Sequence, residues 1–273
     1  MKDVIKLKSK KRLFARLQGE HISPFGGSSI EFLELKEYNY LDNAKHINWE
    51  RSAFANTPLV NIYSDDRELN IVVVYLVSAS LIFKDKKDIA KEAVSILSYS
   101  ATKFNEKLTL LFFSSDIELI FEGLRDGRSF DISYDSASKI DHLSKRVDYN
   151  SLSNFLNSYL KERSLIFLVG DFLDKDINLS ALSFKHELFA IVVRDKNEES
   201  ISAFGGAILK DPVTLKLKRL FISKKGANRY NKAMAKHDLE LFNSFDRFGI
   251  RYTKLYKNSD ILTSLKRLID ARD

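Results

Sequence analysis

The chain has 273 residues, of which 44% are hydrophobic, so its length and composition suffice for a sizeable globular core. It has no cysteine, which excludes a disulfide framework and cysteine-ligated zinc. The first residues lack the apolar centre of a signal peptide, and the longest apolar stretch, 71–83, is too short for a membrane span. We therefore expect a soluble cytoplasmic protein.

The net charge of +7 is concentrated in two basic segments. Residues 1–20 hold seven Lys or Arg residues against two acidic ones, and residues 210–236 hold nine against Asp211. Such segments attract nucleic acid, anionic lipid or an acidic protein surface, or are simply solvated. No nucleic-acid motif accompanies them, which weighs against nucleic acid as a partner. Glycine is scarce and no glycine-rich phosphate loop is present, so the chain is not expected to bind a nucleotide itself.

Residues 1–68 are predicted to form a small N-terminal subdomain. The segment 6–17 has a loose apolar stripe among lysines, which predicts a basic helix. That helix either packs on its own domain or contacts the membrane surface, which would place the protein at the inner face of the membrane. A Gly/Ser turn at 23–29 and short polar-aromatic stretches follow. Trp49 lies among them and is expected to be buried against the sheet, because large aromatic side chains usually anchor packing.

From residue 69 onward, strand and helix patterns alternate. Buried or alternating apolar runs predict strands at 69–77, 107–115, 117–123, 164–172, 186–195 and 249–256. Helical patterns cover 84–104, 152–160, 224–248 and 260–271. The segment 200–222 interrupts the alternation and is predicted to be a hairpin insertion. The alternation predicts an α/β domain over 69–273, with a doubly wound, mostly parallel sheet.

Polar side chains follow two of the buried strands. Ser78 and Ser80 come after the first strand, and Asp171 ends the strand at 164–172. Ligand sites of such sheets lie at the carboxyl ends of the strands. Hydroxyl and carboxylate oxygens suit a hard cation such as Mg²⁺.

The stretch "YLVSAS" resembles the D-x-S-x-S metal-ion-dependent adhesion motif of von Willebrand factor A domains, with Leu76 in the place of the aspartate. The chain more widely resembles the domain of unknown function 58 family, which contains such a domain. Matching positions are Gly19, Ser23, Gly26, Glu31, Phe32, Tyr38, Asp42, Ile47 and Trp49, together with "VGDFLD", "VVRD", "LKDPVT", "RYNKA" and "GIRYTKLY" downstream. The departures from the family pattern are Lys36, Leu41, Leu76, Asn48 and Phe54.

The resemblance implies a von Willebrand A-like fold with a degenerate metal site made of Ser78, Ser80, Ser151 and Asp171. Ser151 is the nearest counterpart of the motif's threonine. Because Leu76 removes one charged ligand, we expect Mg²⁺ to bind weakly or not at all. No other cofactor is expected.

The resemblance also implies a function: a non-enzymatic adaptor that works with a MoxR-type AAA+ ATPase on a client protein. Its contact surface would be the strand-end loops, including Asp116, Asp171 and Phe172. Lys224 and Lys225 would add electrostatic steering.

Enzymatic alternatives have weaker support in the sequence. A metal-dependent hydrolase would need a complete ligand set, which Leu76 interrupts. Five scattered histidines, His21, His46, His142, His186 and His237, match no known catalytic spacing. The acidic run of Asp171, Asp174 and Asp176 is compatible with acid–base chemistry, although such runs more often form capped loops. We therefore expect no enzymatic activity.

Overall fold

A computed structural model of the chain describes residues 30–39, 44, 47–65, 70–103, 106–125, 127–174 and 176–270. These residues form two compact units, one before residue 69 and one after it, and each is described by itself. The basic helix predicted at 6–17 lies outside the described residues. So do the family matches at Gly19, Ser23, Gly26 and Asp42. Across the described residues, no helix is both long and apolar enough to cross a membrane.

The smaller unit is a two-stranded antiparallel sheet, β1 (Ile30–Glu37) and β2 (Leu59–Asp65), with the helix α3 (Trp49–Ala55) between its strands in sequence. Asn48 caps α3, because its Oδ1 accepts a hydrogen bond from the backbone N–H of Arg51 at 3.0 Å. Its Nδ2 donates to Asn61 Oδ1, also at 3.0 Å. An asparagine is as good a helix cap as the aspartate that the family pattern has here. This departure therefore preserves the local structure.

The elements of the smaller unit do not bury Trp49, whose side chain is 72% exposed. Its burial against the sheet would be a contact with the larger unit and stays a prediction. The residue that α3 buries is Ser52, whose hydroxyl donates to the Asn48 carbonyl and accepts from the Leu59 N–H. Hydrogen bonds of the Ser52 hydroxyl, and not the packing of an aromatic ring, therefore attach this short helix to β2. Trp49 and Phe54 both remain on its surface.

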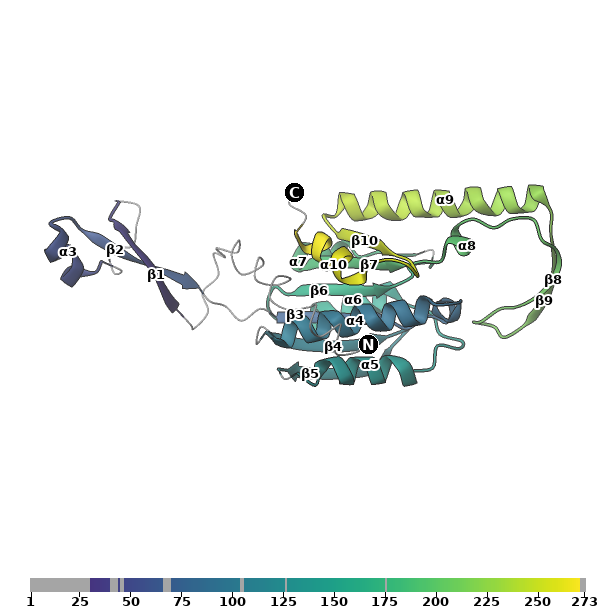
Figure 1. The fold of residues 1–273 in the computed structure, drawn as a ribbon, viewed down its shortest axis with the longest axis horizontal. Coiled ribbons are helices and arrows are strands. Elements are labelled where there is room, and N and C mark those ends of the chain that lie inside the picture. Colours follow the sequence, from purple (N-terminus) through teal and green to yellow (C-terminus); the bar gives the residue numbers. More distant parts are fainter. Residues whose placement is uncertain are drawn as a thin grey trace. The chain divides into compact units, whose positions relative to one another are not determined.

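The larger unit is built on a six-stranded sheet in the order β10-β7-β6-β3-β4-β5 (Figure 1). Its strands are β3 (Asn70–Leu76), β4 (Lys107–Phe113), β5 (Ile117–Leu124), β6 (Leu165–Gly170), β7 (Glu187–Val193) and β10 (Arg251–Leu255). Only β5 runs antiparallel to its neighbour, as a hairpin partner of β4. In chain order this arrangement is 3-2-1-4-5-6, that of doubly wound sheets. The predicted α/β class is confirmed.

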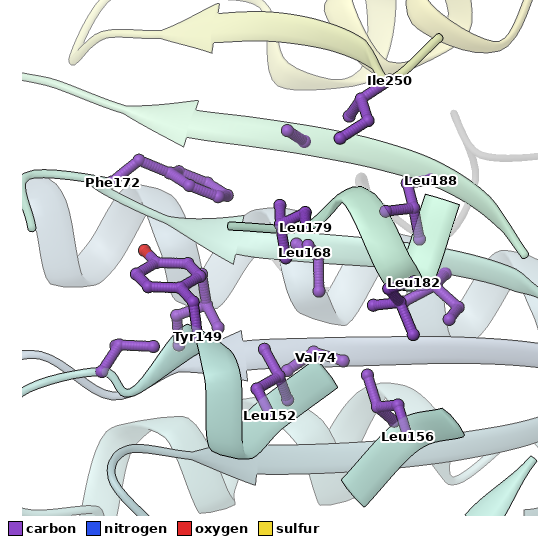
Figure 2. Packing of buried hydrophobic residues seen from close by; sticks show 14 of the residues in the cluster. Val74, Tyr149, Leu152, Leu156, Leu168, Phe172, Leu179, Leu182, Leu188 and Ile250 are labelled. Carbon is purple, nitrogen blue, oxygen red and sulfur yellow. The ribbon is translucent and has the colours of Figure 1, made fainter. Parts of the chain in front are cut away.

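Helices cover both faces of this sheet (Figure 1). One face carries α4 (Lys86–Lys103), α5 (Ser129–Lys139) and α10 (Ile261–Asp270). The other carries α6 (Tyr149–Tyr159), α7 (Ser180–Lys185) and α9 (Lys224–Arg247). The apolar core on this second face joins Val74 and Leu168 of the central strands to Leu152 and Leu182 of the helices (Figure 2).

Three short elements lie near the carboxyl ends of the strands. They are the 3-10 turn η2 (Ala79–Ile82), the one-turn helix α8 (Lys196–Glu199) and the antiparallel hairpin of β8 (Gly205–Lys210) and β9 (Leu217–Ile222). The hairpin lies between α8 and α9 in the chain. Of these elements, η2 and α8 adjoin the positions that the sequence singles out for function.

Candidate functional site

The candidate site lies where the parallel strands β3, β6 and β7 end. Ser78 is the second residue after β3, and Asp171 and Arg194 directly follow β6 and β7. Because neighbouring parallel strands end at the same edge, these residues come together although they are far apart in sequence.

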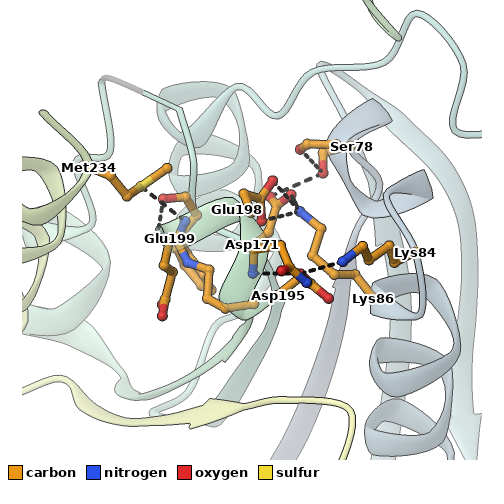
Figure 3. Close-up of polar contacts among 12 residues, drawn as sticks. Ser78, Lys84, Lys86, Asp171, Asp195, Glu198, Glu199 and Met234 are labelled. Carbon is orange, nitrogen blue, oxygen red and sulfur yellow. Dashed lines mark hydrogen bonds and ion pairs between the residues drawn. The ribbon is translucent and has the colours of Figure 1, made fainter. Parts of the chain in front are cut away.

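Ser78, Ser80 and Asp171 meet as the sequence predicts. Figure 3 shows Ser78 beside Asp171. The Ser78 hydroxyl donates to Asp171 Oδ1 at 3.2 Å. The Oγ atoms of Ser78 and Ser80 are 3.1 Å apart. Asp171 is only 2% exposed, so its carboxylate lies beneath the surface.

The second oxygen of Asp171 is bound by a residue that the sequence analysis missed. Lys86, in the first turn of α4, places its ammonium 3.1 Å from Asp171 Oδ2. The same ammonium donates to both carboxylate oxygens of Glu198 on α8, at 2.8 and 2.9 Å. Lys86 has no exposed surface. We call this group, Ser78, Ser80, Lys86, Asp171 and Glu198, the Lys86 centre.

The Lys86 centre carries two carboxylates against one ammonium. Burial raises the pKa of Glu198 above its ordinary value, although the Lys86 charge and hydrogen bond oppose this shift. A buried charge is tolerated only when it is paired and hydrogen-bonded. Here the ammonium meets that requirement for both carboxylates and connects α4 and α8 to the end of β6, while the Ser78 hydroxyl connects the start of η2 to the same Asp171.

A second ion-pair network lies beside the Lys86 centre, at the ends of β7 and β10. The fully buried Arg194 donates to Asp238 Oδ1 of α9 at 2.9 Å. Lys254 bridges Asp238 at 2.6 Å and Glu199 at 2.8 Å. Burial acts to raise the pKa of Asp238, but hydrogen bonds from His237 and Lys254, with the nearby positive charges, hold that pKa at about 2. Since Glu198 and Glu199 are adjacent on α8, this short helix joins the two networks.

The residues present do not fit a bound Mg²⁺. Leu76 is 1% exposed and packs into the core, and a Cβ atom added at Gly170 would stand 2.7 Å from its Cβ. Ser151 is not part of the Lys86 centre, because its hydroxyl donates to Asp148, the cap of its own helix α6, at 2.9 Å. The carboxylates that could bind a cation already bind Lys86. Within the described residues no cluster of three or more His, Asp or Glu side chains could hold a metal ion.

The predicted contact residues differ in their exposure. Asp116, Lys224 and Lys225 are exposed, the last two at the start of α9. Phe172 is fully buried, with a φ of 49°, and its ring packs against Tyr149 and Phe245. Phe172 and Asp171 are therefore parts of the core and of the Lys86 centre, and their side chains present no contact surface.

The described histidines are occupied in structural contacts. His142 Nε2 lies 3.0 Å from the Tyr75 hydroxyl, and its Nδ1 lies 3.0 Å from the Ile140 carbonyl. His186 Nδ1 accepts from the Ser164 N–H. His237 contacts Asp238 and the Asp174 carbonyl. No serine hydroxyl contacts these three histidines in the described part of the chain, whereas His21 and His46 lie outside it.

The predicted acidic run separates in space. Asp171 belongs to the Lys86 centre, while Asp176 is exposed. Burial, with the nearby Asp171 charge, raises the pKa of Asp174 to about 6.

Comparison with known proteins identifies the family. The model of the family described as "Protein of unknown function DUF58" matches residues 34–240. Uncharacterized proteins of Mycobacterium tuberculosis (strain ATCC 25618 / H37Rv) and Mycobacterium bovis (strain ATCC BAA-935 / AF2122/97) are each 23% identical over 281 residues, covering 98% of this chain and 87% of theirs.

Two solved structures are similar in part. The conserved hypothetical protein BatB from Bacteroides thetaiotaomicron has a TM-score of 0.47 at 14% identity, over 74% of this chain and 97% of that chain. A von Willebrand factor type A protein from Catenulispora acidiphila has a TM-score of 0.41 at 9% identity, over 90% of this chain and 51% of that chain. The family match extends over parts of both structural units and over more than half of the chain, and on that match the chain belongs to the DUF58 family.

Proposed function

We propose that this protein is a non-catalytic adaptor that binds other proteins and works with a MoxR-type AAA+ ATPase in their assembly or maturation. The resemblance of the sequence to the DUF58 family suggests the ATPase, and the match to the family model places the chain in that family. The ATPase would supply the energy of ATP hydrolysis, and this chain would bind the client protein.

The observation that carries the proposal is the pairing within the Lys86 centre. The strand ends are where a sheet of this order holds a substrate or a metal. Here both carboxylates are bound by the Lys86 ammonium, and Asp171 also accepts from Ser78. A general acid or base needs a group free to exchange a proton with substrate, and a metal needs free anionic ligands. The Lys86 centre instead resembles a rigid support for the loops around it.

The test is co-purification of the tagged protein from its native cell, with the bound proteins identified. We expect a hexameric AAA+ ATPase among them. Reversing the exposed Lys224 and Lys225 to Glu should slow association with that ATPase and flatten its salt dependence, because rim charges act mainly on the association rate. The matched control reverses Lys103 and Lys107, which are exposed near the opposite end of the sheet. The proposal fails if no ATPase co-purifies at native expression levels.

A further inference from the structure

The hairpin of β8 and β9 is fixed in place but uncovered. At its base, Asn231 of α9 donates to the Ile201 carbonyl and accepts from the Ile201 N–H. At its tip, the Pro212 carbonyl accepts from the Ser144 N–H at 3.0 Å. Within the described chain the two strands pair with each other and with no third strand (Figure 1). A two-stranded sheet is marginally stable without a third strand or a packed helix.

One face of this hairpin exposes large apolar side chains. The strand register places Ile208 opposite Arg219, Lys210 opposite Leu217, and Gly206 opposite Phe221. Since paired residues share a face, these side chains alternate between apolar and cationic. We call Ile208, Lys210, Leu217, Arg219 and Phe221 the hairpin face. Its three apolar side chains are 61%, 70% and 77% exposed.

The surroundings of the hairpin face are strongly basic. Between residues 205 and 236 the chain has nine Lys or Arg residues, and Asp211 is the only acidic residue. The Asp211 carboxylate accepts hydrogen bonds from the backbone of Val213 and Thr214 in the turn, so it is engaged locally. The excess of positive charge in this segment therefore attracts an acidic surface.

We propose that the hairpin face binds an extended acidic segment of a partner protein in which carboxylate and apolar side chains alternate at every second residue, so that both kinds lie on one face of the segment. The inference rests on the adaptor function proposed above and names its docking surface. On the face of the segment that is turned toward the hairpin face, Glu or Asp would pair with Lys210 and Arg219, and the apolar side chains two residues away would cover Ile208, Leu217 and Phe221. The unpaired edges of β8 and β9 would accept such a segment as an additional strand.

Two other occupants fit the hairpin face less well. A lipid surface would have to take in Lys210 and Arg219 together with the apolar side chains between them, and the tip of the hairpin is held by the Ser144 loop. A second copy docking through the same face would bring two basic surfaces together, which is unfavourable. An acidic protein segment with apolar side chains can pair with the cationic side chains of the hairpin face and also cover its apolar ones.

The experiment uses the full chain and a fluorescein-labelled peptide that repeats Glu-Ser-Leu-Ser, in which Glu and Leu share one face of an extended strand, with binding followed by anisotropy. We expect binding that weakens with salt, and no binding of the same peptide with Lys in place of Glu. The double variant Leu217→Ser and Phe221→Ser should weaken binding by roughly tenfold or more. The matched control is Phe184→Ser, since Phe184 is 87% exposed on α7, away from the hairpin. In the parent protein, the peptide should increase hydrogen-exchange protection of the β8 and β9 amides.

Several outcomes would overturn this inference. They are equal binding by the double variant and the Phe184→Ser control, no binding of the acidic peptide, or binding without added protection of β8 and β9. Co-sedimentation with phosphatidylserine vesicles that is lost in the double variant would assign the face to a membrane. Concentration-dependent dimerisation lost in that variant would assign it to a second copy. If the ATPase still co-purifies while the peptide fails to bind, the hairpin inference fails and the adaptor proposal stands.

Discussion

At the scale of single residues, Lys86 differs from the surface lysines of this basic chain in the environment of its charge. Its ammonium is fully buried between Asp171 and Glu198, whereas Lys257, which pairs with Asp85 at 3.0 Å, is 67% exposed. Removing one partner of a buried ion pair leaves an uncompensated charge, while an exposed pair contributes little. We therefore expect Lys86 to contribute much more to the free energy of unfolding than Lys257 does.

Lys86→Met should lower the free energy of unfolding by about 3–5 kcal/mol, because it leaves the Asp171 and Glu198 carboxylates buried without a cation. Lys257→Met, the control, should lower it by less than about 1 kcal/mol. Urea unfolding followed by circular dichroism measures both. Equal, small effects of the two substitutions would mean that the Lys86 centre is not a stabilising core element.

Trp49 gives a second residue-scale prediction, since it is the only tryptophan in the chain. Its own unit leaves 72% of its surface exposed, so without a contact to the larger unit its fluorescence emission should be close to that of indole in water. Unfolding in urea should then shift the emission maximum little. A strongly blue-shifted native spectrum would show that Trp49 is covered.

At the scale of elements, the sequence predicted the strands of the central sheet well, because β3, β4, β6 and β7 are nearly continuous apolar runs. It did not predict α5, whose buried face includes Ser129 and Ser133. The Ser133 hydroxyl donates to the Ser129 carbonyl at 2.7 Å, and Ser129 lies 2.6 Å from Thr102 of α4. Small hydroxyl residues satisfied by local bonds can pack closely between helices, but they give no apolar periodicity.

Only a part of the Lys86 centre could be predicted from the sequence. Ser78, Ser80 and Asp171 follow buried strands, and the rule for strand ends brings them together. Lys86 sits in the run "KDKKD", which has the composition of a solvated surface. One signal was present: Lys86 shares the helix face of Ile89, Ala90 and Ala93, all buried. Glu198 gave no comparable signal, because its position depends on how α8 follows β7.

The loop after α5 provides a pH-dependent contact with β3. Burial and the nearby Lys87 lower the pKa of His142 to about 4, from an ordinary value of 6.5. The unfolded chain therefore binds more protons than the folded chain between pH 6.5 and pH 4, so this contribution to stability is complete above pH 6.5 and is lost as the pH falls to 4. Asp174 acts in the opposite direction, since its raised pKa adds stability as the pH falls from about 6 towards 3.8.

His142→Gln keeps a hydrogen-bonding side chain but does not titrate. The difference in unfolding free energy between the parent and this variant should therefore shrink as the pH falls from 6.5 to 4. Urea titrations at several pH values measure this difference. A constant difference across that range would show that His142 has an ordinary pKa in the folded protein.

At the scale of the whole molecule, two features of the larger unit have different roles in the proposed adaptor. The Lys86 centre holds the loops at the strand ends in place, and the hairpin between α8 and α9 presents exposed apolar and basic side chains. If the Lys86 ammonium is the cation of the site, recognition by this protein does not depend on a divalent metal ion.

The most direct test is therefore the response of the melting temperature to Mg²⁺. A working site with a Kd of about 1 mM would gain about 1.4 kcal/mol in about 10 mM Mg²⁺. For a chain of this size, that gain corresponds to a rise of about 3–6 °C. We predict less than half of this rise for the parent protein, and a larger rise for Lys86→Ala, which frees two carboxylates and the space of the lysine side chain. A full rise in the parent protein that is abolished by Ser78→Ala would show that a metal ion, and not Lys86, is the cation of this site.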